Sequence, residues 1–380
     1  MQKNVSFCFF MLLFYSGLSY GGLYQNPASL TWYLISFFSL LFVFLAYFFA
    51  NCKQHRFYLI LILFFYIASS FWTLIQSPNP ICDCFTTVKE SSIFFLKGIN
   101  PYTSRFSQVY PNVIPDYFPH LPLSFIIVAP FTILFQDPRV SIVFFNLIIS
   151  YIFYSLYTEK SQHDKFLNLF IFCYLFLPRS SYMLEHMYQE TAIFLFFMLF
   201  FYFFHRKKFF FALMSLSFFF AIKQHLIVLI PFLIKQNKIL KNVKANILAF
   251  VPAITITLVF FFIDTSAFLR NTIYTFFRGD LAAPVRNSLS VPTFLSVFIT
   301  GRIPILFSAV LFCFVYLFYV KKRLDFLAST ITVLFFLHFF AFYSFFNHYF
   351  LVILILYFYI FLLFIKHPIL REFTEHENAD

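Results

Sequence analysis

Charged residues are scarce in this 380-residue chain: they make up 11% of it, whereas about 25% is usual in a soluble domain. Hydrophobic residues make up 61% and aromatic residues 25%, and they occur in long runs such as residues 30–50, 57–76 and 345–365. About 20 apolar residues are enough to cross a bilayer as a helix. The composition therefore argues against a soluble protein and predicts an all-α, multi-spanning membrane protein.

Acidic residues are scarcer than basic ones, because 15 Asp and Glu stand against 27 Lys and Arg, for a net charge of +12. In a soluble protein such a surplus often indicates nucleic-acid binding. Here the charges lie between the apolar runs, so they are interpreted as topology signals and as attraction to anionic lipid headgroups, with no nucleic-acid partner.

Cysteine is also sparse, with six scattered residues. Only Cys82 and Cys84 share a loop, where they flank Asp83, and cysteines separated by one residue rarely pair with each other. The spacing predicts neither a disulfide framework nor a zinc site. The sequence shows no internal repeat and no low-complexity linker, so residues 1–380 are expected to form one integral domain without a cofactor.

The apolar runs predict a polytopic bundle of about 12 membrane-spanning helices. Several runs hold fewer than about 17 residues, so some are expected to be half-helices packed against other helices. The first run lacks a small-x-small cleavage site and is expected to be retained rather than removed as a signal peptide. The predicted spans are residues 5–20, 30–50, 57–76, 121–136, 140–157, 165–178, 190–204, 209–222, 225–234, 245–263, 303–320, 325–342 and 348–366.

The positive charges predict the orientation, because Lys and Arg favour the cytoplasmic side of a membrane. The loops 77–120, 264–302 and 343–347 fall on the outer face, and the acidic tail 367–380 falls in the cytoplasm. Five apolar runs lie between Arg56 and Arg206, but an even number of crossings is needed if both residues are cytoplasmic. Residues 140–178 are therefore expected to cross the membrane only once, with a kink near 158–165. The cytoplasmic charges are Lys53, Arg56, Arg206, Lys207, Lys208, the run 235–244, Lys321, Lys322 and Arg323.

Asp83 opens the most informative part of the chain, the outer loop 77–120. It follows an apolar span and precedes a weakly amphipathic helical pattern, which is typical of a helix on a membrane surface. Asp83 is either a functional carboxylate, a solvated loop acid or the N-cap of a helix beginning near Thr86. The residues that fall on one rough stripe of that helix, away from Glu90 and Lys97, are Phe85, Val88, Ser92, Phe95 and Leu96.

A constrained segment follows this surface helix. Gly98 can end the helix, and the Asn-Pro-Tyr sequence at 100–102 favours an extended turn. The chain then re-enters apolar sequence through the proline-rich segment 117–122. The segment could simply be a proline-bounded helix start with interfacial aromatic side chains. That interpretation does not explain why the loop is constrained at both ends.

Lys223 and His225 interrupt the apolar run 209–234 near its middle. A lysine within a bilayer is unfavourable by several kcal/mol and is functional by default. One continuous helix would also place the lysine-rich run 235–244 outside, against the charge rule. Two short helices meeting at an outward-facing cavity are therefore expected, and snorkelling of Lys223 to the headgroups is the alternative.

Polar residues elsewhere are weaker candidates. Arg278 and Arg286 lie in the outer loop 264–302, where they could bind an anionic phosphate or form an ordinary salt-bridged loop. His348 stands at a membrane entry and could be either a ligand-binding or an interfacial residue. A further polar group consists of Glu185, His186, Gln189 and Glu190. These residues could cap a helix, and their spacing does not suit a zinc site.

Taken together, the block 83–122 resembles the first outer loop of GT-C superfamily glycosyltransferases, most closely the polyprenol-phosphate-mannose-dependent mannosyltransferases. Asp83 matches the acid taken as catalytic base in that family. Tyr188-Gln189 stands where such enzymes have Gly-Gln, so the glycine is absent here. The segments 221–224 and 347–349 are similar to later family motifs. The residues that match the loop and re-entry signatures are Gly98, Asn100, Pro101, Tyr102, Tyr117, Pro119 and Pro122.

The resemblance implies a GT-C-type fold and an inverting transfer of mannose or another hexose or pentose. The donor would be a polyprenyl-phosphate sugar and the acceptor an envelope lipid or glycan. Asp83 would be the general base and Gln189 would bind acceptor or sugar, with no metal. The groups expected to bind the donor phosphate are Lys223, His225, Arg278, Arg286 and His348.

Other classes of protein stay open. A lipid or polysaccharide transporter or flippase also carries charges near the membrane midplane, although it would predict inverted repeats. A non-catalytic subunit of an envelope-assembly machine would leave Asp83 dispensable. A polymerase or ligase of lipid-linked oligosaccharides is a further enzymatic alternative. The location expected is a bacterial inner membrane, with the active site on the periplasmic face.

Overall fold

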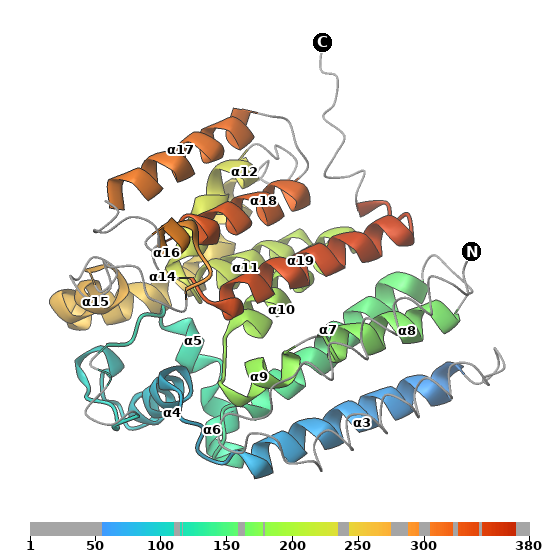
Figure 1. Ribbon diagram of the computed structural model, residues 1–380, viewed down its shortest axis with the longest axis horizontal. Coiled ribbons are helices and arrows are strands. Elements are labelled where there is room, and N and C mark those ends of the chain that lie inside the picture. The colour runs from blue at the N-terminus through green and yellow to red at the C-terminus, as the bar shows by residue number, and fades with distance from the viewer. Residues whose placement is uncertain are drawn as a thin grey trace. The chain divides into compact units, whose positions relative to one another are not determined.

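The computed structural model describes residues 55–109, 115, 117–158, 164–177, 179–234, 243–274, 288–295, 305–321, 326–341 and 344–369. These residues form helices and connecting turns, with no strand among them, which confirms the all-α prediction (Figure 1). The predicted spans 5–20 and 30–50, the arginines Arg278 and Arg286, and most of the tail 367–380 lie outside the described residues.

The chain divides into two compact units. The first comprises Met1–Glu90, Phe106–Pro115 and Val128–Tyr188, and the second comprises Ser91–Arg105, Asp116–Ile127 and Gln189–Asp380. The grouping of all 380 residues in one integral domain stays a prediction.

The first unit is built on three long helices, α3, α7 and α8, which lie side by side (Figure 1). Asn146 of α7 joins them: its amide nitrogen donates to the Tyr66 hydroxyl of α3 at 2.6 Å, and its oxygen accepts from the Tyr174 hydroxyl of α8. Such hydrogen bonds hold helices together where apolar contact alone gives little specificity. The helices of this unit are α3 (His55–Gln76), the start of α4 (Asp83–Leu96), α6 (Ala129–Phe135), α7 (Val140–Thr158), α8 (Asp164–Leu175) and α9 (Ser180–Glu185).

The second unit packs α10 against α11 and α19 around phenylalanine rings. Phe201 of α10 contacts Phe326 of α18 and Phe358 of α19, with ring centroids 6.3 and 5.5 Å apart. Its elements are the 3-10 helix η2 (Pro101–Thr103), α5 (Leu123–Ile126), α10 (Glu190–His205), α11 (Phe209–Phe220), the 3-10 helix η3 (Gln224–Leu229), α12 (Ile230–Ile234), α14 (Val243–Ile263), α15 (Thr265–Thr272), α16 (Val291–Leu295), α17 (Ile305–Lys321), α18 (Phe326–Phe339) and α19 (Phe346–Phe364).

Three helices in the described part of the chain are long and apolar enough to cross a membrane. They are the spans Arg56–Gln76, Val140–Thr158 and Phe346–Phe364, with a fourth if the pair Leu248–Ile263 and Thr265–Thr272, bent by 115°, counts as one. The count of about 12 crossings, expected from the length of a spanning helix, is not confirmed.

The exposed side chains of α3 fall on one face, as expected for a helix that meets lipid on one side. Tyr66, Ser70 and Thr73 are buried on the opposite face. Only one face of the helix therefore packs within the unit, and the polar Ser70 and Thr73 lie on that face. The large exposed side chains follow one another at steps of three or four residues, with one step of seven between Phe64 and Phe71. They are Phe57, Ile60, Phe64, Phe71 and Ile75.

The predicted span 121–136 is not a continuous helix. It is broken into α5 and α6 at Ile127 and Val128. Pro130 in the first turn of α6 has no backbone N–H, so it cannot extend the hydrogen bonding of the preceding helix. The break also coincides with the division between the two units, since Ile127 ends a segment of the second and Val128 begins a segment of the first.

Arg139 connects four segments of the first unit and is completely buried. Its guanidinium binds the Asp137 carboxylate through Nε at 2.9 Å and Nη2 at 2.6 Å. Nη1 donates to the backbone oxygens of Ser77 at 2.7 Å and Glu185 at 3.4 Å. The guanidinium carbon also lies 4.7 Å from the centre of the Phe85 ring in the first turns of α4. One side chain thus joins the segment after α3, the start of α4, the entry to α7 and the end of α9.

We expect Arg139→Lys to destabilise the protein by about 3 kcal/mol, because an ammonium cannot replace a buried bidentate guanidinium. The measurement is the thermal unfolding midpoint of the purified protein in detergent. Arg105→Lys is the control, since Arg105 is exposed. Equal midpoints for the two variants would show that Arg139 does not organise this unit.

Candidate functional site

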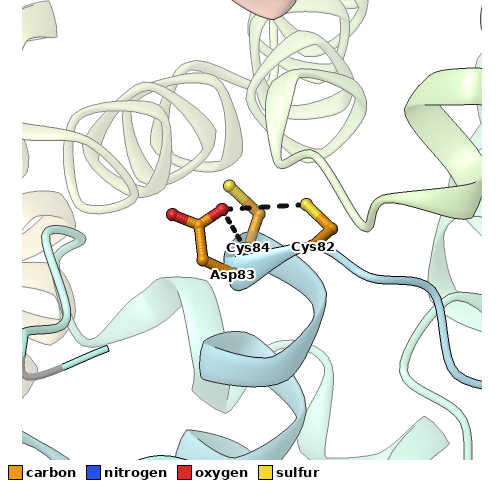
Figure 2. Close-up of side chains that lie close together, drawn as sticks. All are labelled: Cys82, Asp83 and Cys84. Atoms are coloured by element: carbon orange, nitrogen blue, oxygen red, sulfur yellow. Dashed lines mark hydrogen bonds between the residues drawn. The ribbon is translucent and has the colours of Figure 1, made fainter. Parts of the chain in front are cut away.

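Asp83 is the first residue of α4, which begins three residues before the predicted start at Thr86. Its Oδ1 accepts a hydrogen bond from the backbone N–H of Cys84 at 2.9 Å and a weak one from the Cys82 thiol at 3.8 Å. Figure 2 shows its second carboxylate oxygen pointing away from both cysteines. Among the described residues, no ion pair includes Asp83. The carboxylate is thus held through one oxygen, and the other is oriented to interact elsewhere.

The surroundings of Asp83 combine thiols and aromatic rings. Cys82 is buried, and its sulfur lies 4.0 Å from the backbone oxygen of His186. The rings of His186, Tyr182 and Tyr188 form a cluster, with the His186 centroid 4.1 Å from Tyr182 and 5.7 Å from Tyr188. The predicted polar group at 185–190 is therefore divided: His186 lies near the Asp83 segment, whereas Gln189 and Glu190 belong to the second unit.

Burial is the main reason why the pKa of Asp83 is raised above its ordinary value, and the charge of the Cys82 thiolate adds to the effect. A hydrogen bond with the Cys84 side chain holds the pKa of Cys82 well below its ordinary value, with His186 acting in the same direction. Burial raises the pKa of Tyr188. A carboxylate with a raised pKa is a better proton acceptor than an ordinary aspartate.

Lys223 lies in a break between helices, as predicted: α11 ends at Phe220, and Lys223 is extended before η3 begins. Its ammonium donates to Oε1 of Glu190 at 2.7 Å, and the Asn347 amide donates to the same oxygen at 3.2 Å. Lys223 is 5% exposed and Glu190 only 1%, so Lys223 does not snorkel to the surface of the protein. An outward-facing cavity at this place stays a prediction.

Several polar atoms around this ion pair have no hydrogen-bond partner among the described residues. They are Oε2 of Glu190, both amide atoms of Gln189 and the amide oxygen of Asn347. Each of the three side chains is at least nine-tenths buried. A buried polar atom without a partner costs about 1–3 kcal/mol. This cluster can therefore accept hydroxyl or water groups at little further penalty.

Three histidines form a second group in the same unit. The ring centroids of His338 and His348 lie 4.8 Å apart, those of His225 and His338 5.3 Å, and those of His225 and His348 6.3 Å. Nδ1 of His348 accepts from the backbone N–H of Phe345 at 3.2 Å. The structure thus brings together His225 and His348, both predicted. Sequence reasoning missed His338, whose only signal is a polar side chain inside an apolar helix.

Tyr102 is the loop-signature residue that lies in an aromatic cluster, with Phe118, Phe125, Phe260 and Phe268 around its ring. The Tyr102 hydroxyl donates to the backbone oxygen of His120 at 2.8 Å, and its ring lies 5.0 Å from Phe268. The Asn100 side chain accepts from the backbone N–H of Tyr102 at 3.1 Å. Gly98 has a φ of 71°, which is typical of a glycine that ends a helix. The predicted helix stop and turn are both confirmed.

Two amide side chains tie the re-entry segment to other parts of the second unit. Asn271 accepts from the backbone N–H of Phe118 at 2.7 Å and donates to the backbone oxygen of Tyr102 at 2.9 Å. Gln224, next to Lys223, donates to the backbone oxygen of Pro119 at 3.0 Å. Sequence reasoning missed Asn271, because nothing local marks an asparagine as a bridge between distant segments. Pro122 begins the turn into α5, and Tyr117 and Pro119 are half-buried.

No family model, no curated protein and no solved structure matches this chain. A function must therefore be argued from the residues of the chain itself.

We expect Lys223→Met to destabilise the protein by about 3–5 kcal/mol, because it leaves the buried Glu190 without its counter-charge. Adding Glu190→Gln to Lys223→Met should restore most of the stability. The measurement is the thermal unfolding midpoint in detergent, with Lys97→Met at an exposed position as control. A double variant less stable than the single one would contradict the ion pair.

Proposed function

We propose that this chain is a membrane glycosyltransferase that moves a sugar from a polyprenyl-phosphate donor to an envelope acceptor, with Asp83 as general base. The observation that carries the proposal is the Asp83 carboxylate itself. It is half-buried, held through one oxygen at the start of a helix, and not neutralised by a cation among the described residues. Its resemblance to the family's catalytic acid supports the same role.

One carboxylate is chemically sufficient for this transfer. The acceptor hydroxyl gives its proton to Asp83 as its oxygen attacks the anomeric carbon. The bond between that carbon and the phosphate oxygen breaks, and its electron pair leaves with the phosphate. Because phosphate is a stable anion, no acid is needed to protonate the leaving group, in contrast to glycoside hydrolysis.

The position of Asp83 along the chain suits a lipid-linked donor. The helix α3 can cross a membrane, and it ends at Gln76, seven residues before α4 begins at Asp83. A polyprenyl tail stays in the bilayer, so its phosphosugar head lies at the membrane surface. A carboxylate a short turn beyond a spanning helix is where such a head group can be reached. The orientation toward the outer face of a bacterial inner membrane is part of the proposal.

The resemblance, rather than the placement of the two units, assigns the rest of the substrate to residues outside the Asp83 segment. Developing charge on the leaving phosphate is stabilised by fixed cations and hydrogen-bond donors. We assign binding of the donor phosphate to Lys223, whose ammonium also binds Glu190, and to the imidazoles of His225 and His348. Arg278 and Arg286 are assigned the same role. The amides of Gln189 and Asn347 carry unpaired atoms and suit the hydroxyl groups of a sugar.

A transporter or flippase is the second candidate, and the Lys223–Glu190 pair among apolar helices favours it. Ionisable residues within membrane helices often mark transport pathways. The two functions differ in what they require of Asp83. A flippase would move lipid-linked sugars across proteoliposomes equally well after Asp83→Asn, and it would form no glycosylated product.

We expect Asp83→Asn to lower sugar transfer by at least about 10²-fold, because base catalysis commonly supplies about 10²–10⁴ in rate. The measurement is transfer of radiolabel from polyprenyl-phosphate sugars by the purified protein. Glu90→Gln is a matched control on the same helix, where Gln can still accept from the backbone N–H of Ser107. If Asp83→Asn keeps wild-type transfer while remaining folded, Asp83 is not the base.

A further inference from the structure

Cys82, Asp83 and Cys84 bring three metal-binding atoms together at the start of α4. Their two sulfurs and a carboxylate oxygen all lie within 4.8 Å of one another. Figure 2 shows the three side chains rising from the same end of the helix. The sequence spacing predicts no zinc site, since consecutive residues rarely point to one side. The convergence occurs where a bent segment, in which the backbone N–H of Cys82 donates to the backbone oxygen of Pro80 at 2.8 Å, passes into the first turn of α4.

The separations are close to those that a tetrahedral zinc ion requires. Zinc binds thiolate sulfur at about 2.3 Å and carboxylate oxygen at about 2.0–2.2 Å, which places two such ligands about 3.5 Å apart. The Cys82 sulfur lies 3.8 Å from Oδ1 of Asp83. These two donors are therefore separated by nearly the distance that two ligands of one zinc ion require.

We propose that Cys82, Asp83 and Cys84 form a binding site for a thiophilic divalent cation of the Zn²⁺ class. Two thiolates favour such ions over Mg²⁺, Ca²⁺ and Mn²⁺, which prefer oxygen ligands. With two thiolates and one carboxylate, the bound Zn²⁺ carries a net charge of −1. An anionic complex suits a helix N-terminus, whose unpaired N–H groups attract negative charge. Cys84 and Asp83 are half-buried, so the site is accessible to an ion.

These side chains would supply three protein ligands and leave the fourth position of a tetrahedral ion to a water or a substrate. That number is typical of zinc sites that exchange a water or substrate, whereas structural sites have four protein ligands. The binding proposal does not depend on the proposed sugar transfer. If Asp83 is also the general base, an ion on its carboxylate would prevent it from accepting a proton, and Zn²⁺ would inhibit transfer.

The test is a titration of the reduced, tag-free, full-length protein with Cd²⁺, which reports thiolate ligands by charge-transfer absorption in the ultraviolet. We expect one Cd²⁺ bound with thiolate absorption, loss of that absorption in Cys82→Ser/Cys84→Ser, and no loss in Cys173→Ser/Cys313→Ser. Asp83→Asn should keep the absorption but weaken binding at least about tenfold. Absent absorption in the wild type, or unchanged absorption in Cys82→Ser/Cys84→Ser, would overturn the proposal.

A second measurement uses the wild-type chain and so does not depend on the folding of a variant. N-ethylmaleimide modification is mapped by mass spectrometry with and without saturating Zn²⁺. We expect Zn²⁺ to slow modification of Cys84 at least about tenfold. Equal labelling of Cys84 in both conditions would refute binding. Because neither readout involves sugar transfer, failure of the metal site and failure of the proposed enzyme are distinguishable.

Discussion

A charge buried among apolar helices needs a counter-charge, and this constraint organises both units of the protein. In the first unit, Arg139 is completely buried and is neutralised by Asp137, while its remaining donors bind backbone oxygens of Ser77 and Glu185. In the second, Lys223 is buried against Glu190. Leaving either cation unpaired would cost several kcal/mol. The segments that carry the partners are therefore held where the charges meet.

Asp83 differs from these paired groups, and the difference gives it chemical significance. Its carboxylate lies in no ion pair among the described residues. Burial raises its pKa, and the charge of the neighbouring Cys82 thiolate adds to the effect. The Asp83 carboxylate can therefore bind a proton or a cation, because no neighbouring cation among the described residues already neutralises it. A proton from an acceptor hydroxyl and a thiophilic cation are two partners of that kind, which is why a base and a metal ligand can be proposed at one position.

Much of the helical structure could be predicted because it depends on local pattern. The runs 140–157 and 190–204 correspond to Val140–Thr158 and Glu190–His205, within one residue at each end. Gly98 ends α4 as expected, and the helix breaks ahead of Lys223. Membrane crossing was harder to predict, because an apolar helix shorter than a bilayer is equally suited to packing inside the protein. The count of about 12 crossings depended on that ambiguity.

The sequence by itself determined the all-α class and the position of most helices, since these follow from the apolar runs and from residues that start or stop a helix. Only the tertiary structure decided which distant groups meet. Glu190 could be interpreted as a helix cap until it was seen to hold Lys223, and Asn271 had no evident role until it bridged Phe118 and Tyr102. Such pairings depend on the packing of segments far apart in the chain, and no local pattern encodes them.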